Sequence, residues 1–137
     1  SVDLPIPVSL PASYIPDRQT RTRLYRRLAD LRTQDEIEAL SEEFIDRFGP
    51  LPSEAQNLLY QLKVKLMAEK AGLASISGEG GQVILRFPPL PEGETTRSIP
   101  DLGREIRTGK NAIWMPGANS DGWQAELLVV LEKLIPN

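Results

Sequence analysis

The sequence predicts an α+β fold: an N-terminal proline-rich edge strand, a helical hairpin that forms the core, a small and mainly antiparallel sheet, and a C-terminal helix. Three observations support this class. Two helical patterns meet at a glycine–proline stop within residues 33–72, two short apolar runs flank a glycine-rich turn within residues 73–87, and an apolar pattern of helical period fills residues 121–135. Helices and strands that follow one another in separate runs are typical of α+β domains.

The N-terminal residues 1–16 contain four prolines, which exclude a helix. Apolar residues fill every even position from Val2 to Leu10, the alternation expected of a strand. Three of the prolines fall at odd positions, so they remove backbone donors from one edge of that strand only. We therefore expect a paired strand at the edge of the sheet. An extended arm left from an interdomain linker is the alternative.

Residues 17–32 predict a helix capped by Asp17, with an apolar stripe of Leu24, Leu28 and Leu31 beside Tyr25. Six arginines crowd the rest of its surface, and they have two interpretations. One is internal pairing, because the next helix carries six carboxylates against a single basic residue. The other is a patch for nucleic acid or another acidic partner, formed by Arg18, Arg21, Arg23, Arg26 and Arg27.

The following stretch predicts two consecutive helices. Thr33 and Ser53 each precede a Glu or Gln by three residues, the spacing of a capping box. Gly49 and Pro50 stop the first helix, because proline lacks a backbone donor and clashes with the preceding turn. Gly72 suits the C-cap of the second helix. Apolar residues of both helices are expected in the core: Ile37, Leu40, Phe44, Phe48, Leu58, Leu59, Leu62 and Leu66.

The second half of the chain predicts the sheet and the final helix. A GEGG turn at residues 78–81 lies between two apolar runs and predicts a β-hairpin, followed by a loop. Residues 98–110 are expected to form a short helix with Asp101 near its start, and residues 111–115 a further strand. The helix over residues 121–135 is expected to bury Trp123, Leu127, Leu128, Leu131 and Leu134.

Composition limits the function. A chain of 137 residues is expected to form a single domain, 1–137, and because it begins at Ser1 we expect a fragment of a longer protein. The absence of cysteine and histidine removes thiolate metal sites and the commonest general base. No catalytic, metal or cofactor motif is found, so we expect no cofactor and no enzymatic activity in this domain. No apolar run is long enough to span a membrane, and the net charge of −3 argues against bare nucleic acid as the partner.

Three signatures are specific: a proline-rich strand that ends in YIPD, a helix with the sequence Tyr-Arg-Arg, and the motif IDRFGPLP. They lie in four segments, VDLPIPVSLPASYIPD (2–17), LYRRLADLRTQDEIEAL (24–40), EEFIDRFGPLPSEAQNLL (42–59) and KLMAEKAGL (65–73). They closely resemble the start of the C-terminal domain of the bacterial transcription-repair coupling factor. After residue 73 only the order of elements is similar. The resemblance implies a cytoplasmic, ATP-driven translocase on double-stranded DNA that binds stalled RNA polymerase and recruits excision repair.

The resemblance also implies an inhibitory role. The domain in this family packs on an N-terminal, excinuclease-B-like module and covers the surface that binds excinuclease A. The acidic residues of the family motif E-x-I-D-R-F contact basic residues of that module, so we expect an interdomain interface at Glu43, Asp46 and Arg47. The alternative for Glu43 is pairing with Arg47 or with the arginine helix. A nucleic-acid-binding module is the alternative function, and a purely structural cap on the motor is a third.

Overall fold

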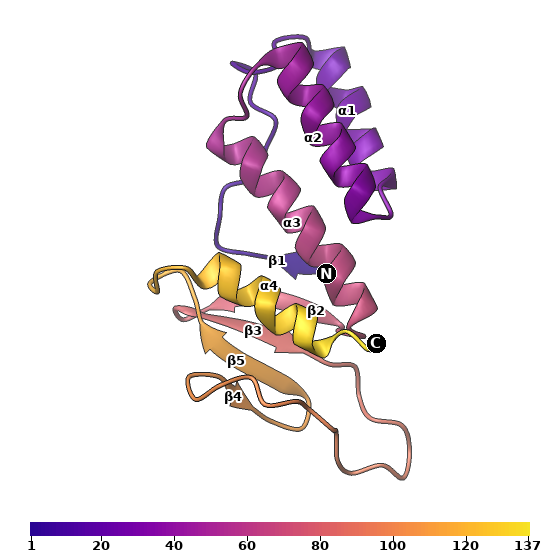
Figure 1. Cartoon of the computed structure of the whole chain (residues 1–137), viewed down its shortest axis with the longest axis vertical. Helices are drawn as coiled ribbons and strands as arrows, with labels where there is room; N and C mark the ends of the chain where they lie inside the picture. The colour runs from indigo at the N-terminus through magenta and orange to yellow at the C-terminus, as the bar shows by residue number, and fades with distance from the viewer. The chain divides into compact units, whose positions relative to one another are not determined.

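The computed structural model describes residues 1–137 and confirms the α+β class. The chain forms two compact units, residues 6–66 and residues 1–5 together with 67–137, and each has buried apolar residues of its own. A single domain over the whole chain stays a prediction. The elements labelled in Figure 1 are, in chain order, β1 (Val2–Asp3), α1 (Arg18–Asp30), α2 (Gln34–Phe48), α3 (Ser53–Lys70), β2 (Ser75–Glu79), β3 (Gln82–Arg86), β4 (Arg107–Thr108), β5 (Ala112–Pro116) and α4 (Trp123–Leu134).

In the unit of residues 6–66, α1 and α2 lie side by side (Figure 1). The side chain of Asp17 caps α1 by accepting the Thr20 N–H at 3.0 Å, and the Thr33 hydroxyl caps α2 by accepting the Glu36 N–H at 3.2 Å, both as predicted. α2 ends at Gly49, whose φ of 91° is unstrained only for glycine. The buried core of this unit consists of Leu10, Ile15, Leu24, Leu28, Ile37, Leu40, Phe44, Ala55, Leu59 and Leu66.

The N-terminal strand is much shorter than predicted. Only Val2 and Asp3 pair with a neighbouring strand, although they do so at the sheet edge, as expected. From residue 6 onward the chain forms no strand and is an arm bonded to helices, with a turn at residues 12–14. Its origin from an interdomain linker stays a prediction. The Ser9 N–H donates to the Glu54 carbonyl, and the Leu10 N–H donates to the Tyr25 hydroxyl at 2.7 Å. Two of the remaining donors thus find partners on α3 and α1 instead of on a neighbouring strand.

The second capping box, at Ser53, is not formed. Ser53 lies inside α3, and the first turn is closed on the carbonyl of Pro52, which accepts the Gln56 N–H at 3.0 Å. The Ser53 hydroxyl donates to Glu54, and the Gln56 side chain reaches back to the carbonyl of Leu51. The helix therefore starts one residue earlier than a serine cap would allow.

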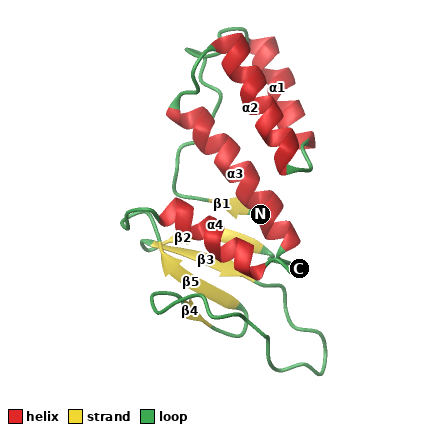
Figure 2. Cartoon of the chain, viewed as in Figure 1, coloured by secondary structure: helices red, strands yellow, loops and turns green.

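In the unit of residues 1–5 and 67–137, five strands form one sheet in the order β1-β2-β3-β5-β4 (Figure 2). Only β1 and β2 are parallel, and all other neighbours are antiparallel, as predicted. The β2–β3 hairpin turns at Gly80 and Gly81, whose φ values of 58° and 79° fit a type I′ turn. β3 is central, and its residues Val83, Ile84 and Leu85 are all buried.

The helix predicted over residues 98–110 is absent. The segment is irregular and ends in β4, which pairs with β5 at Trp114 and Ile113. Gly103 has a φ of 106° and donates its N–H to the Asp101 carboxylate, a turn that a helix cannot contain. A glycine inside a helix also costs about 1 kcal/mol relative to alanine. The apolar residues Leu102 and Ile106 are buried although they belong to a loop, which explains their spacing without a helix.

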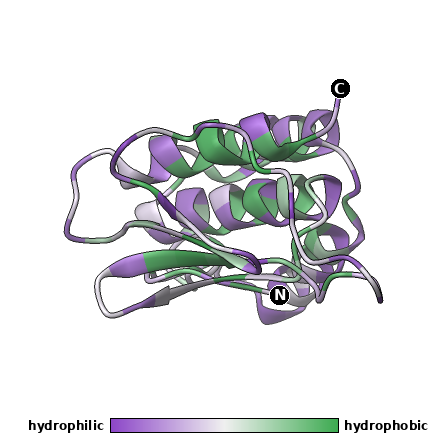
Figure 3. Ribbon diagram, turned by 90° about the horizontal axis from the view of Figure 1, so that it is seen from below, coloured by the Kyte–Doolittle hydropathy of each residue, from purple (hydrophilic) through white to green (hydrophobic).

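The C-terminal α4 is present, with Trp123, Leu127 and Leu131 buried as predicted. Val130 is buried as well, whereas Leu128 and Leu134 are only half-buried, so the apolar face is rotated slightly from the predicted one. In Figure 3 the helix ribbons alternate between hydrophobic and hydrophilic residues, as expected of amphipathic helices. No helix combines the length and the apolarity needed to cross a membrane.

Candidate interaction surfaces on α1 and α2

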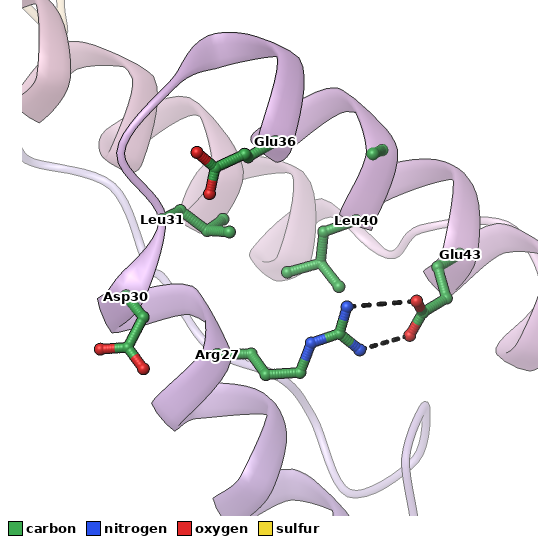
Figure 4. Close-up of a pocket in the computed structure, with 7 residues that line it drawn as sticks. Arg27, Asp30, Leu31, Glu36, Leu40 and Glu43 are labelled. Atoms are coloured by element: carbon green, nitrogen blue, oxygen red, sulfur yellow. Dashed lines mark hydrogen bonds and ion pairs between the residues drawn. The ribbon is translucent and has the colours of Figure 1, made fainter.

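The carboxylate of Glu43, predicted to face a partner, is already bound inside the unit of residues 6–66. Arg27 of α1 donates to it with both terminal nitrogens, at 2.6 Å and 3.2 Å, in the bidentate geometry of strong Arg–carboxylate pairs (Figure 4). Arg47, one turn further along α2, adds a third contact at 3.4 Å. The alternative of internal pairing is therefore realised at Glu43.

The Arg27–Glu43 pair lies at the rim of a hollow of about 380 Å³ between α1 and α2. Leu40 lies next to the pair, and Leu31 lines the hollow further away, near Glu36 (Figure 4). The hydrogen bond from Arg27 lowers the pKa of Glu43, and the same bond raises the pKa of Arg27. The Glu43 side chain is still 36% exposed, so water screens the pair and keeps its contribution to stability small.

The side chain of Asp46 has no partner within the molecule, whereas that of Arg47 has two. The side chain of Asp46 is exposed and makes no ion pair or hydrogen bond within the molecule. Arg47 is held at two points, by Glu43 and by the ring of Phe48, whose centroid lies 4.8 Å from the guanidinium carbon. Of the three predicted interface residues, the structure brings Glu43 and Arg47 together and leaves Asp46 free.

The acidic residues of α2 that form no ion pair extend further along the helix than the predicted interface of Glu43, Asp46 and Arg47. Asp35, Glu38, Glu42 and Asp46 follow one another at intervals of three, four and four residues, so they share one face of the helix, and none of them forms an ion pair. We call these four residues the acidic stripe. Ile45, 46% exposed, lies beside it. Both features are visible in the sequence: the intervals of three and four residues between the acids, and the position of Ile45 off the apolar face of the helix.

The acidic stripe borders a second hollow, of about 370 Å³, between α2 and α3. Glu38 and Glu42 line it together with Ile37, Leu59 and Tyr60. Burial raises the pKa of the Tyr60 hydroxyl above its ordinary value. The face of α2 next to α3 thus combines carboxylates with apolar side chains.

The arginines of α1 divide into two groups. Arg27 is paired with Glu43, and Arg21 donates to the carbonyls of Ile15 and Pro16 at 2.7 Å and 3.0 Å, where it holds the end of the arm. The predicted pairing of the two helix rims is therefore limited to one arginine. The side chains of three others form no ion pair or hydrogen bond and line a hollow of about 490 Å³ with Gln19 and Thr22: Arg18, Arg23 and Arg26.

The fold and these surfaces define a small α+β domain whose helical unit presents opposite charges on neighbouring helices. The family described as the TRCF domain matches residues 4–97, more than half of the sequence, so the chain belongs to the TRCF domain family. It is similar to the transcription-repair-coupling factor of Escherichia coli (strain K12), with 42% identity over 84 residues that cover 61% of this chain and 7% of that protein.

The similarity extends further in other relatives. The transcription-repair-coupling factor of Staphylococcus epidermidis (strain ATCC 12228) is 30% identical over 129 residues, 89% of this chain and 11% of the relative. A crystal structure of the C-terminal domain of transcription-repair coupling factor has the same fold, with a TM-score of 0.79 at 23% identity, covering 98% of this chain and 90% of the other. The resemblance found in the sequence is confirmed, and it continues beyond residue 73. The chain spans about a tenth of the length of these relatives.

Proposed function

We propose that this chain is a non-catalytic regulatory domain of an ATP-dependent DNA translocase that couples transcription to nucleotide excision repair. The domain docks on the N-terminal, excinuclease-B-like module of the same protein and masks the surface that binds excinuclease A. Membership in the TRCF domain family and the names of its relatives support this parent protein. RNA polymerase and DNA are bound by the parent, and docking restrains its motor until polymerase is engaged.

The observation that carries the docking step is the unpaired acidic stripe on α2. Four carboxylates on one helix face, none of them in an ion pair, attract a basic surface, and salt weakens that attraction. Lys63 of α3 lines the hollow beside Glu38 and Glu42, so the charge is least compensated toward Asp46. Ile45 adds an apolar contact beside Asp46. An interface of this polar kind can be released, as an inhibitory contact within one protein requires.

The three predicted interface residues take different roles in this proposal. Asp46 meets the partner as a free carboxylate, so it contributes most to docking. Glu43 is held by Arg27 and shares its remaining acceptor capacity with Arg47, so a basic partner group must join or displace an existing pair. Arg47 is fixed between Glu43 and Phe48 and sets the border of the acidic surface.

Asp46→Lys tests the docking directly, because it removes no internal contact. Binding of the 137-residue chain to the parent's isolated N-terminal module is measured by titration at low and at physiological salt. We expect a loss of at least about tenfold at low salt, since repulsion replaces a favourable charge pair. Glu132→Lys on α4 is the control, because it makes the same charge change at an exposed, unpaired site of the other unit. Equal binding of both variants and wild type contradicts the docking surface.

The regulatory consequence is tested in the full-length parent. Combined Glu43→Lys and Asp46→Lys substitutions are expected to raise ATP turnover in the absence of polymerase and to increase capture of excinuclease A. Turnover and capture at wild-type levels, with the domain still folded by circular dichroism, rule out this assignment. If deletion of the whole domain lowers only stability and leaves regulation intact, the structural-cap interpretation replaces it.

A further inference from the structure

The outward face of α1 carries three guanidinium groups that form no ion pair and no hydrogen bond within the molecule. Arg18 and Arg26 lie two turns apart with Thr22 between them, and Arg23 and Gln19 complete the same hollow. This face is opposite the buried residues Leu24 and Leu28, so the arginines project away from the core of residues 6–66.

The other ionisable groups of α1 explain why the three stay unpaired. Its two flanking carboxylates, Asp17 and Asp30, lie at the two ends of the helix, and none lies between them. Asp17 is engaged as the cap: the hydrogen bonds from Thr20 lower its pKa first, and the charges of Arg23 and Arg21 lower it further. The middle of the face therefore has an uncompensated positive charge in a chain whose net charge is −3.

The chemistry of this face fits phosphate groups. Its guanidinium groups and the Gln19 amide supply hydrogen-bond donors, and arginine matches phosphate oxygens with two parallel bonds. From Arg18 to Arg26 the face extends about 12 Å along the helix axis at 1.5 Å per residue. A DNA strand carries about three phosphates over that length of duplex.

The same face lacks what other polyanionic partners need. Protein interfaces are anchored by buried aromatic or aliphatic side chains, and single strands stack on aromatic rings. None of the five side chains that line the hollow is apolar or aromatic. Tyr25, the one aromatic residue of α1, accepts the Leu10 N–H and does not line the hollow. We propose that Arg18, Arg23 and Arg26 form a binding surface for the phosphate backbone of duplex DNA.

This surface is independent of the proposed docking, because it lies on α1 and uses no residue of the acidic stripe. When the domain is released from the inhibitory contact, this surface binds the DNA duplex on which the parent acts. That use rests on the proposed parent, whereas the affinity of the chain for duplex DNA does not.

The test is fluorescence anisotropy of a labelled duplex of about 20 base pairs with the 137-residue chain. A surface that neutralises three phosphates is expected to lose about 40-fold in affinity between about 50 and about 200 mM salt, since the logarithmic slope is about −0.9 per phosphate. The Arg18→Gln, Arg23→Gln, Arg26→Gln variant should bind weakly at both salt concentrations and show a slope near zero. The control variant carries Lys65→Gln, Lys70→Gln and Arg104→Gln, which remove the same charge from exposed positions without ion pairs.

Three outcomes overturn the proposal. The first is no binding of wild-type chain at low salt. The second is equal loss of affinity in both triple variants, which attributes binding to net charge. The third is tighter binding of a glutamate-rich peptide or of a single strand of equal charge than of the duplex, which assigns the face to an acidic protein or to single-stranded nucleic acid. Loss confined to the α1 variant, with unchanged circular dichroism, supports it.

Discussion

The neighbouring helices α1 and α2 are built alike and differ in charge. Each begins at a side-chain cap and buries a short apolar stripe against the same core. In α2 the charges agree with the helix dipole, with Asp35 and Glu36 in the first turn and Arg47 in the last. α1 has Arg18 and no acid in its first turn, although its N-cap Asp17 and the Arg27 of its last turn agree with the dipole. The dipole accounts for the terminal charges of both helices, whereas the unpaired groups along each helix, acidic on α2 and basic on α1, are the ones that we propose to meet partners.

The largest expected difference between the two helices lies in their cores. Phe44 of α2 is 0% exposed and its ring meets that of Phe48 edge-on at 6.3 Å between centroids, and Leu28 of α1 is 3% exposed. Phe44→Ala should lower the free energy of unfolding by about 4 kcal/mol, and Leu28→Ala by about 3 kcal/mol, because the larger side chain leaves the larger cavity. Urea unfolding followed by circular dichroism measures both.

Ile45→Ala is the matched control for these truncations. The residue is adjacent to Phe44 on α2 but 46% exposed, so its loss should change the free energy of unfolding by no more than about 0.5 kcal/mol. A larger effect of Leu28→Ala than of Phe44→Ala would make α1, rather than α2, the organising helix of this core.

Much of the helical unit could be predicted from the sequence because its determinants are local. Asp17 and Thr33 start helices, and Gly49 ends one, by hydrogen bonds and dihedral angles that involve only a few neighbouring residues. The hairpin at Gly80 and Gly81 is local in the same sense. The family motif E-x-I-D-R-F was enough to predict Glu43 and Asp46 as interface residues, with no knowledge of the fold.

Features that depend on distant partners could not be predicted. Residues 98–110 have a helical apolar spacing, but pairing of Arg107 and Thr108 with β5 decides their structure. Residues 6–10 continue the alternation of a strand, yet the donors of Ser9 and Leu10 meet helices. Likewise the six arginines look equivalent in sequence, and only the distance between α1 and α2 selects Arg27 for Glu43.

One tyrosine hydroxyl links the N-terminal arm to α1 and another links it to the end of α2. Tyr14 donates to the carbonyl of Gly49 at 2.7 Å and lies 3.2 Å from that of Phe44, whereas Tyr25 of α1 accepts the Leu10 N–H. Tyr14→Phe should cost about 1–2 kcal/mol, because it leaves the Gly49 carbonyl at the end of α2 without its hydrogen-bond partner. Tyr25→Phe should cost less, since this side chain is 41% exposed and water can replace its oxygen. Thermal unfolding of both variants decides the order.

The smallest expected effect is that of the ion pair that joins the two helices. A double-mutant cycle of Arg27→Ala and Glu43→Ala should give a coupling free energy of roughly 0–1 kcal/mol, because both side chains are substantially exposed. Arg47 is replaced by alanine in every member of the cycle, so that its contact with Glu43 does not mask the coupling.

The sign of the pH dependence identifies the pair. Arg27 lowers the pKa of Glu43 in the folded state, so the folded protein holds the proton less tightly than the unfolded chain, whose pKa is about 4.3. The stabilisation is therefore present above that value and is lost as the pH falls through the lowered pKa of the folded state. Urea unfolding at neutral pH and at progressively lower pH, down to where the protein remains folded, should show the coupling shrink only in the acidic range. A coupling that stays constant into the acidic range contradicts an ionic contact and leaves packing of the Arg27 stem over Leu40 as the link between α1 and α2.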